Sequence, residues 1–229
     1  MANNSSVKKI QIQNSAQNGI SGYANIGISF ANVMAKVEDV KVLVGNAAVA
    51  GGVITGICSG GSLGHAILNN VTAEANNGSA SAFCSNSGGN MTILNSRGVA
   101  VTNGTAIAVD SRGEGPVGTV VVTNSYLEAK GIQGGGSRTI DAGACNINIS
   151  NSKIFAQNDG SGPSYSMYIG YDCVIKNSEI RVAGGGAGIE GASSTTKVAN
   201  TLIQNGFGGG SGYKSFNNYD ENFSAIPNQ

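Results

Sequence analysis

Charged side chains and tryptophan are what this sequence lacks most. Only 11% of the 229 residues are charged, the 13 basic and 13 acidic side chains cancel, and there is no tryptophan. Without an excess of one charge, a surface lacks the field that attracts nucleic acid, an anionic membrane or a polyanion. We therefore expect no nucleic-acid partner. We do expect copies of the chain to associate with one another, because little repulsion separates them.

Long apolar runs are also missing. No segment reaches the length of a membrane-spanning helix, and the residues before Ile10 lack the apolar stretch of a signal peptide. The sequence thus predicts no membrane insertion and shows no signal peptide in this chain. It also contains no P-loop, dinucleotide fingerprint or nucleophile elbow in a suitable context, so no cofactor is expected.

What the sequence does contain is a short phrase that recurs along the chain. An apolar residue and one further residue are followed by Asn and then by a small polar residue, as in Ile93-Leu94-Asn95-Ser96. Successive asparagines of this phrase are separated by 26, 29, 27, 26 and 23 residues. A period in this range marks an architecture of stacked repeats.

Each repeat contains three short apolar runs, for example 120–122 before the Asn, 126–129 after it and 139–140 beyond a Gly-rich connection. Their alternation predicts strands. Three short strands cannot bury an apolar face alone, but coils of such strands can be stacked around a continuous interior. The sequence therefore predicts an all-β fold: a single-stranded parallel β-helix of about eight coils, with three short strands per coil, over residues 1–205.

Over roughly residues 10 to 205, this pattern resembles the right-handed parallel β-helix of the pectin-lyase-like superfamily. The resemblance implies right-handed winding, which crossover connections between parallel strands also favour. Enzymes of that superfamily use acidic calcium ligands with an arginine, or several aspartates with a histidine in a Gly-His-Gly setting. The nearest phrase here is Gly64-His65-Ala66, and no lyase pattern is matched. The resemblance therefore implies a fold rather than an activity.

The recurring asparagines are expected at the bend between the first two strands of each coil. Asn tolerates left-handed dihedrals, satisfies backbone groups at a corner and can hydrogen-bond to copies of itself on neighbouring coils. We interpret the following residues as a structural ladder: Asn69, Asn95, Asn124, Asn151, Asn177 and Asn200.

Two carboxylates are expected on adjacent coils. The third run ends in Val109-Asp110 in one coil and in Ile140-Asp141 in the next, which places these side chains about 5 Å apart by strand spacing. Such a pair could supply the acid and the base of a glycosidase or seed a calcium site. The alternative is an exposed ion-pair cluster with Arg112 and Arg138. If the protein is an enzyme, Asp110 and Asp141 are the candidate catalytic residues.

The four cysteines form two pairs, each separated by about one repeat. Cys58 and Cys84 are 26 residues apart, and Cys145 and Cys173 are 28 apart, so each pair is expected to be stacked. Buried fillers are one interpretation, and a disulfide between adjacent coils is the other, where the Cβ directions allow it. No metal site is predicted, because there is no Cys-x-x-Cys and His65 is the single histidine.

Tyr165, Tyr168 and Tyr171 form the one local aromatic cluster within the repeats. The flat face of an aromatic ring can pack on the C–H surface of a sugar, so these residues are a possible carbohydrate-binding surface. The alternative is that they occupy ordinary corner or interior positions.

The repeats end at about residue 205, and segment 206–229 is predicted to be a C-terminal capping or docking tail. It contains Tyr213, Phe216, Tyr219 and Phe223. Because an open solenoid end exposes strand edges and apolar interior, such ends are usually covered. We expect these aromatic residues to cap the end. The alternative is that they dock another molecule.

The sequence is compatible with three functions. The first is a non-enzymatic structural protein that self-associates into a fibre, surface array, or virion or spore assembly, located on an extracellular-facing surface. The second is a polysaccharide lyase or glycoside hydrolase that uses Asp110 and Asp141. The third is a carbohydrate- or host-binding adhesin. The expected partner is the chain itself, with a polysaccharide as the alternative.

Overall fold

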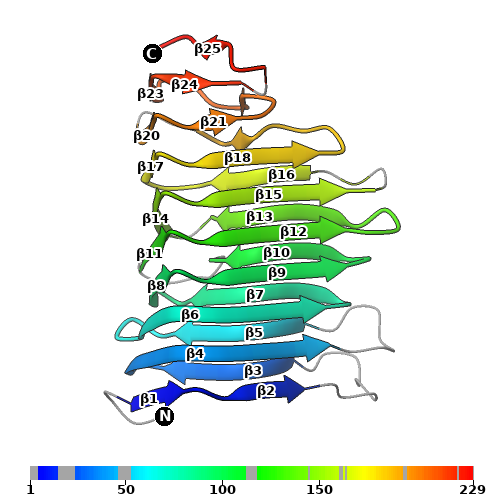
Figure 1. Cartoon of the computed structure of the whole chain (residues 1–229), viewed down its shortest axis with the longest axis vertical. Coiled ribbons are helices and arrows are strands. Elements are labelled where there is room, and N and C mark those ends of the chain that lie inside the picture. The colour runs from blue at the N-terminus through cyan, green and yellow to red at the C-terminus, as the bar shows by residue number, and fades with distance from the viewer. Residues whose placement is uncertain are drawn as a thin grey trace.

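The computed structural model describes residues 5–14, 24–45, 53–111, 118–143, 145–159, 162, 164–192, 195–220 and 222–228. Within them the chain is all-β, without a helix. Its coils stack along the long axis, with the two termini at opposite ends (Figure 1). Every strand pairing in this part of the chain is parallel except that between the last two strands. The predicted parallel β-solenoid is confirmed.

The first two strands of each coil belong to one 17-stranded sheet. Its strands are β1 (Ser5–Lys8), β2 (Gln11–Asn14), β4 (Met34–Gly45), β6 (His65–Asn76), β8 (Asn90–Leu94), β9 (Arg97–Thr102), β11 (Gly118–Thr123), β12 (Tyr126–Gly131), β14 (Cys145–Ser150), β15 (Lys153–Asn158), β17 (Cys173–Lys176), β18 (Glu179–Ala183), β20 (Thr196–Ala199), β21 (Leu202–Ile203), β23 (Lys214–Phe216), β24 (Asn218–Tyr219) and β25 (Ala225–Ile226).

The third strand of each coil belongs to a second, eight-stranded sheet. Its strands are β3 (Ala24–Ala31), β5 (Val53–Gly60), β7 (Ser79–Asn86), β10 (Thr105–Asp110), β13 (Gly136–Ala142), β16 (Ser164–Ile169), β19 (Ile189–Glu190) and β22 (Phe207–Gly208). The stack has about six regular turns, close to the predicted eight. Less regular coils at the two ends also contribute strands to the eight-stranded sheet.

The N-terminal coils depart from the three-strand pattern. β4 and β6 are continuous strands of 12 residues, each occupying the place of two shorter strands. Both still bend, because Asp39 and Asn70 have φ values of 54° and 53°. The parallel pairing continues through the bend, so these coils have two long strands where three short ones were expected.

The outer side of the corner is formed by residues with left-handed backbone. Asn95, Asn124, Asn151, Asn177 and Asn200 have φ values of 49–51°. In the coil of β6 the corner residue is Asn70, one position after the predicted Asn69. Asn217 continues the series at the C-terminal end, with a φ of 52°.

Side-chain hydrogen bonds join these corners. Asn124 Nδ2 donates to Asn95 Oδ1 over 3.4 Å, and Asn200 Nδ2 donates to Asn177 Oδ1 over 3.2 Å. Asn217 Nδ2 in turn donates to Asn200 Oδ1 over 2.9 Å. Asn95 Nδ2 donates to Asn69 rather than to the corner residue Asn70. Because a left-handed φ strains most side chains and Asn tolerates it, the same residue recurs at this corner.

The inner side of the corner carries a second ladder, which the sequence analysis missed. Ser125 Oγ accepts from the backbone N–H of Ser96 over 3.1 Å and donates to the carbonyl of Thr123 over 2.8 Å. The same paired contacts recur at Ser96, Ser152, Ser178 and Thr201. Each hydroxyl satisfies buried backbone groups at the bend. We call this set the serine ladder.

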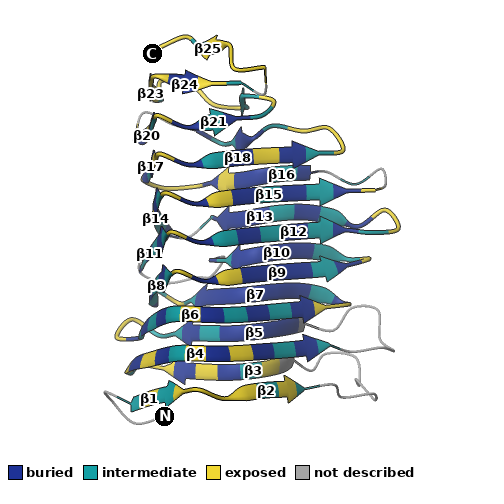
Figure 2. Ribbon diagram, in the orientation of Figure 1, coloured by how far each residue is buried: buried dark blue, intermediate teal, exposed yellow. Residues whose placement is uncertain are grey.

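The core lies between the two sheets. Buried and more exposed residues alternate along many strands, as expected when one face of each strand points inward (Figure 2). One file of stacked side chains in register illustrates the core, and all its members are buried: Leu68, Ile93, Val122, Ile149, Ile175 and Val198. Each buried aliphatic side chain of this size contributes about 1.5–3 kcal/mol.

The parallel ladder extends into the segment that the sequence assigned to a tail. β23 pairs with β20 and β24 pairs with β21, so residues beyond 205 form one further level of the stack. There the interior becomes polar, because Ser215 follows Val198 in register, and Asn218 bonds to Ser215 Oγ and to the Val198 carbonyl. β25 then pairs antiparallel with β24.

Candidate functional site

The outer face of the eight-stranded sheet carries a file of chemically reactive side chains. The residue before each member belongs to the buried core, so the members face away from it. Parallel register stacks them directly on one another. We call this file the outer column, and its members are Cys58, Cys84, Asp110, Asp141, Tyr168 and Glu190.

Two residues that lie three positions before a column member on the same strand, Ser81 and Arg138, contact side chains of this column. Ser81 Oγ donates to Asp110 Oδ2 over 3.3 Å, although Ser81 precedes Asp110 by one coil. Arg138 forms an ion pair with Asp141, with 2.8 Å between the guanidinium nitrogen and Oδ2. The same guanidinium lies 5.3 Å from the centre of the Tyr168 ring. Side chains from two files therefore converge on this face.

The predicted adjacency of Asp110 and Asp141 is confirmed, since the two residues are direct partners in the parallel ladder. Their surroundings differ from those expected of a catalytic pair. Asp141 is only 1% exposed and is held by Arg138, which neutralises its charge. A carboxylate so enclosed cannot touch a polymeric substrate. Arg112, the other arginine of the predicted ion-pair cluster, lies outside the described residues.

The tyrosine cluster lies on the same outer face. Tyr165 and Tyr168 are on β16, in register with Arg138 and Asp141 respectively, and Tyr171 follows the end of the strand. Tyr168 and Tyr171 are partly exposed, at 38% and 43%. The Tyr168 ring lies against the Arg138 guanidinium, so part of its surface is already used within the protein.

The two cysteine pairs occupy different environments. Cys58 and Cys84 are direct partners on the outer column, and their sulfur atoms are 2.8 Å apart. Cys145 and Cys173 are not in register, because Cys173 pairs with Ile147, and both are buried. Burial raises the pKa of Cys145 to about 11 and also raises the pKa of Cys173.

The described part of the chain offers few side chains that could bind a metal ion together. It contains no group of three or more His, Cys, Asp or Glu side chains arranged to hold a metal ion. His65 lies on β6 in the other sheet, where its Nε2 is 3.1 Å from Thr92 Oγ1. Among these residues there is also no helix with the length and apolar character to cross a membrane.

The C-terminal aromatic residues, predicted to cap the end, differ in burial. Tyr213 packs on the core and stacks on Phe207, with ring centres 4.0 Å apart. Phe216 and Phe223 are instead 63% and 76% exposed, and Tyr219 is partly exposed. This is not the burial expected of capping residues. We call Phe216, Tyr219 and Phe223 the aromatic patch.

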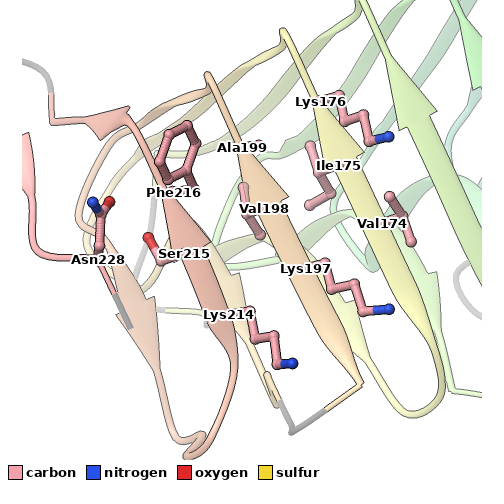
Figure 3. A pocket seen from close by; sticks show the side chains of 10 residues that line it. All are labelled: Val174, Ile175, Lys176, Lys197, Val198, Ala199, Lys214, Ser215, Phe216 and Asn228. Carbon is pink, nitrogen blue, oxygen red and sulfur yellow. The ribbon is translucent and has the colours of Figure 1, made fainter.

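Two grooves adjoin this patch, one beside the asparagine corner and one along it. The first has a volume of about 610 Å³. It lies over Ala199, and Lys176, Lys197, Lys214, Phe216 and Asn228 surround it (Figure 3). The small Ala199 side chain leaves this space, because Phe216 and Lys176 occupy the equivalent positions on the neighbouring coils.

The second groove has a volume of about 570 Å³ and runs along the ladder itself. Asn177, Asn200, Tyr219 and Phe223 are among the residues that line it. Amide groups and aromatic rings thus share one surface near the C-terminal end of the stack.

Comparison with protein-family models, with curated proteins and with solved structures finds no match to this chain. The proposals below therefore rest on the sequence and the geometry of this molecule alone.

Proposed function

We propose that this chain is a structural protein, a rigid rod of stacked coils that adds further copies of itself end to end. The observation that carries the proposal is that, within the described residues, both ends of the stack have strand edges without a pairing partner and incompletely buried apolar residues. Low charge over the whole chain supports it, because copies can approach without strong repulsion.

The open edges are seen in the strand pairing. β1 and β2 pair only with β4, and β3 pairs only with β5, within the described residues. At the other end, β22 and β23 pair, among the residues that the structure describes, only with the strands that precede them in the stack. An unpaired strand edge is a template for pairing with another chain. β25 occupies the edge of β24, so an incoming copy would pair with β22 and β23.

Apolar residues at the two ends also favour an end-to-end contact between copies. Those that pack on the core while remaining partly exposed all belong to the first or the last coils: Val7, Ile12, Val33, Phe207, Tyr213 and Ile226. Stacking the first coil of one copy on the last coil of another would bury them. Because this contact joins unlike surfaces, it repeats without closing and generates a filament.

Sedimentation velocity over a range of concentrations, together with electron microscopy, tests the proposal. We expect concentration-dependent growth into rods of uniform width. Phe216→Glu places a charge at the proposed junction and should weaken association about tenfold or more. Phe155→Glu is the matched control, because Phe155 is half-buried on β15, which pairs with β12 on one side and β18 on the other and so lies away from both ends. A monomer at every concentration, or equal effects of the two variants, would contradict the proposal.

A second candidate function is carbohydrate binding at the C-terminal grooves. Tyr219 and Phe223 offer ring faces for sugar C–H groups, and the Asn177 and Asn200 amides of the same groove can donate to hydroxyls and accept from them. Binding of neutral oligosaccharides, followed by calorimetry, should be lost in Phe223→Ser and kept in Tyr168→Ser. The enzyme hypothesis has less support, because Asp141 is enclosed and paired.

A further inference from the structure

Cys58 and Cys84 are placed to react with each other. They lie on adjacent strands β5 and β7 as direct partners in the parallel ladder. Neighbouring strands are about 4.7–4.9 Å apart, which lies within the range of Cα separations that a disulfide spans. Their sulfur atoms are 2.8 Å apart, closer than two thiol sulfurs ordinarily approach.

Access to the pair is one-sided. Cys58 is half-buried and reachable from solvent, whereas Cys84 is 6% exposed. The amide of Asn86 lies 3.8 Å from the Cys58 sulfur, which is within reach of a weak hydrogen bond. A reagent in solution therefore meets Cys58 first, and the Cys84 sulfur lies 2.8 Å from the sulfur that has reacted.

We propose that Cys58 and Cys84 form a modification site, a dithiol that low-molecular-weight disulfides oxidise to a disulfide between two adjacent coils. The Cys58 thiolate attacks one sulfur of the small disulfide, whose S–S bond breaks, and one small thiolate leaves and takes up a proton. Cys84 then loses its proton to solvent and attacks the Cys58 sulfur, which releases the second small thiolate. Both cysteines are oxidised, and the small disulfide is reduced to two thiols.

The electrostatics agree with this order of attack. The hydrogen bond with Cys84 lowers the pKa of Cys58, against the opposing effects of burial and of the Asp110 carboxylate. A thiolate, not a thiol, is the nucleophile in disulfide exchange. Cys58 is therefore the attacking residue, and Cys84 completes the reaction.

The second cysteine pair provides an internal control. Cys145 and Cys173 are separated along the sequence by almost the same distance as Cys58 and Cys84. They are buried, out of register, and have raised pKa values because burial disfavours the thiolate. Sequence spacing alone does not distinguish the pairs, but register and exposure do.

The oxidised bond would join β5 to β7 and close the chain between them into a loop. Closing a loop restricts the unfolded chain more than the folded one. Oxidation should therefore raise the temperature at which the protein unfolds. The proposal is independent of end-to-end assembly, since the pair lies on the outer face of the eight-stranded sheet and at neither end.

Incubation of the full-length native protein with glutathione disulfide, followed by peptide mapping with mass spectrometry, tests this inference. We expect a Cys58–Cys84 cross-link, loss of two titratable thiols, and a higher midpoint of thermal unfolding that returns on reduction. The double variant Cys145→Ser/Cys173→Ser should give the same cross-link.

The single variants separate the two steps. Cys84→Ser should stop at a stable glutathione adduct on Cys58, and Cys58→Ser should react at least tenfold more slowly, because its remaining thiols are enclosed. A persistent adduct on Cys58 in the native protein, a cross-link that involves Cys145 or Cys173, or absence of reaction in folded protein would each overturn the proposal.

Discussion

The asparagine corner and the outer column are both files of stacked residues, yet one repeats and the other varies. At the corner, each regular coil places Asn on the outside and Ser or Thr on the inside. On the outer column the residue type changes along the stack, from two cysteines to two aspartates and then to Tyr168.

The difference reflects what the backbone requires at each place. A bend with left-handed φ and buried N–H groups needs the same side-chain chemistry in every coil. An outward position on a straight strand makes no such demand, so its residues are free to differ. Repetition at this corner therefore marks residues that the bend itself requires, whereas the varied file carries residues whose roles differ from coil to coil.

The largest expected effect concerns Asp141 of the outer column and its partner Arg138. Arg138→Met leaves the Asp141 carboxylate, which is 1% exposed, without this partner. Because the carboxylate is enclosed while the Arg138 side chain is 32% exposed, loss of this partner should cost about 2–3 kcal/mol of unfolding free energy, measured by chemical denaturation. The control is Arg97→Met, whose ion pairs with Glu74 and Glu128 are more open to solvent and worth below about 1 kcal/mol. Equal losses would remove the distinction between enclosed and surface pairs.

At the corner, Ser125→Ala should cost about 2 kcal/mol, because it leaves the buried N–H of Ser96 and the carbonyl of Thr123 without their partner. Ser150→Ala is the matched control. The Ser150 hydroxyl contacts only the Thr123 hydroxyl among the described contacts and is half-buried, so its loss should cost less than about 0.5 kcal/mol. A small effect at Ser125 would mean that the serine ladder does not hold the bend.

Asn124 separates the two contributions of the outer corner. Asn124→Ala loses the hydrogen bond to Asn95 and introduces a residue that is strained at a φ of 49°. It should cost about 1 kcal/mol of unfolding free energy. Asn124→Gly loses the bond but accepts the backbone angle. Thermal unfolding should rank native, Gly and Ala variants in that order of decreasing stability. A Gly variant less stable than the Ala variant would show that relief of the left-handed angle counts for less than the conformational entropy that Gly adds to the unfolded chain.

The smallest effect on stability is expected at Cys58. The prediction there concerns how the rate of Cys58 alkylation depends on pH. Its pKa is lowered by the hydrogen bond with Cys84, so its alkylation rate should level off at a lower pH than that of an ordinary thiol. Cys84→Ala removes this bond and should move the profile to higher pH. Rates are measured by mass spectrometry with iodoacetamide. An unchanged profile in Cys84→Ala would contradict the assigned cause.

Much of the fold is readable from the sequence because the corner repeats. The Asn period predicts the stacked coils, and the adjacency of Asp110 and Asp141 follows from the same alignment. The serine ladder was also readable, since Ser or Thr follows the recurring Asn in most copies of the phrase. We missed it because the pattern shows a polar residue after the bend without showing that the chain turns that residue inward.

Other features depend on tertiary structure and could not be read from the repeat. Asn69-Asn70 offers two candidates for one corner, and only the register selects Asn70. The enclosure of Asp141 depends on Arg138, which reaches it across three residues of the same strand. The exposure of Phe216 and Phe223 follows from one further coil and β25, which carry the chain beyond the predicted end of the repeats.

The central claim is that the coils stack in register, and distances between spin labels test it most directly. Lys36, Thr92 and Lys197 belong to one outward file of the 17-stranded sheet. In a background without the native cysteines, Thr92→Cys/Lys197→Cys should give a distance of about 19 Å, four strand spacings, and Lys36→Cys/Lys197→Cys about 29 Å, six spacings. Equal distances for the two pairs, or distances that do not grow with the number of coils between the labels, would contradict the stacked architecture and every assignment built on it.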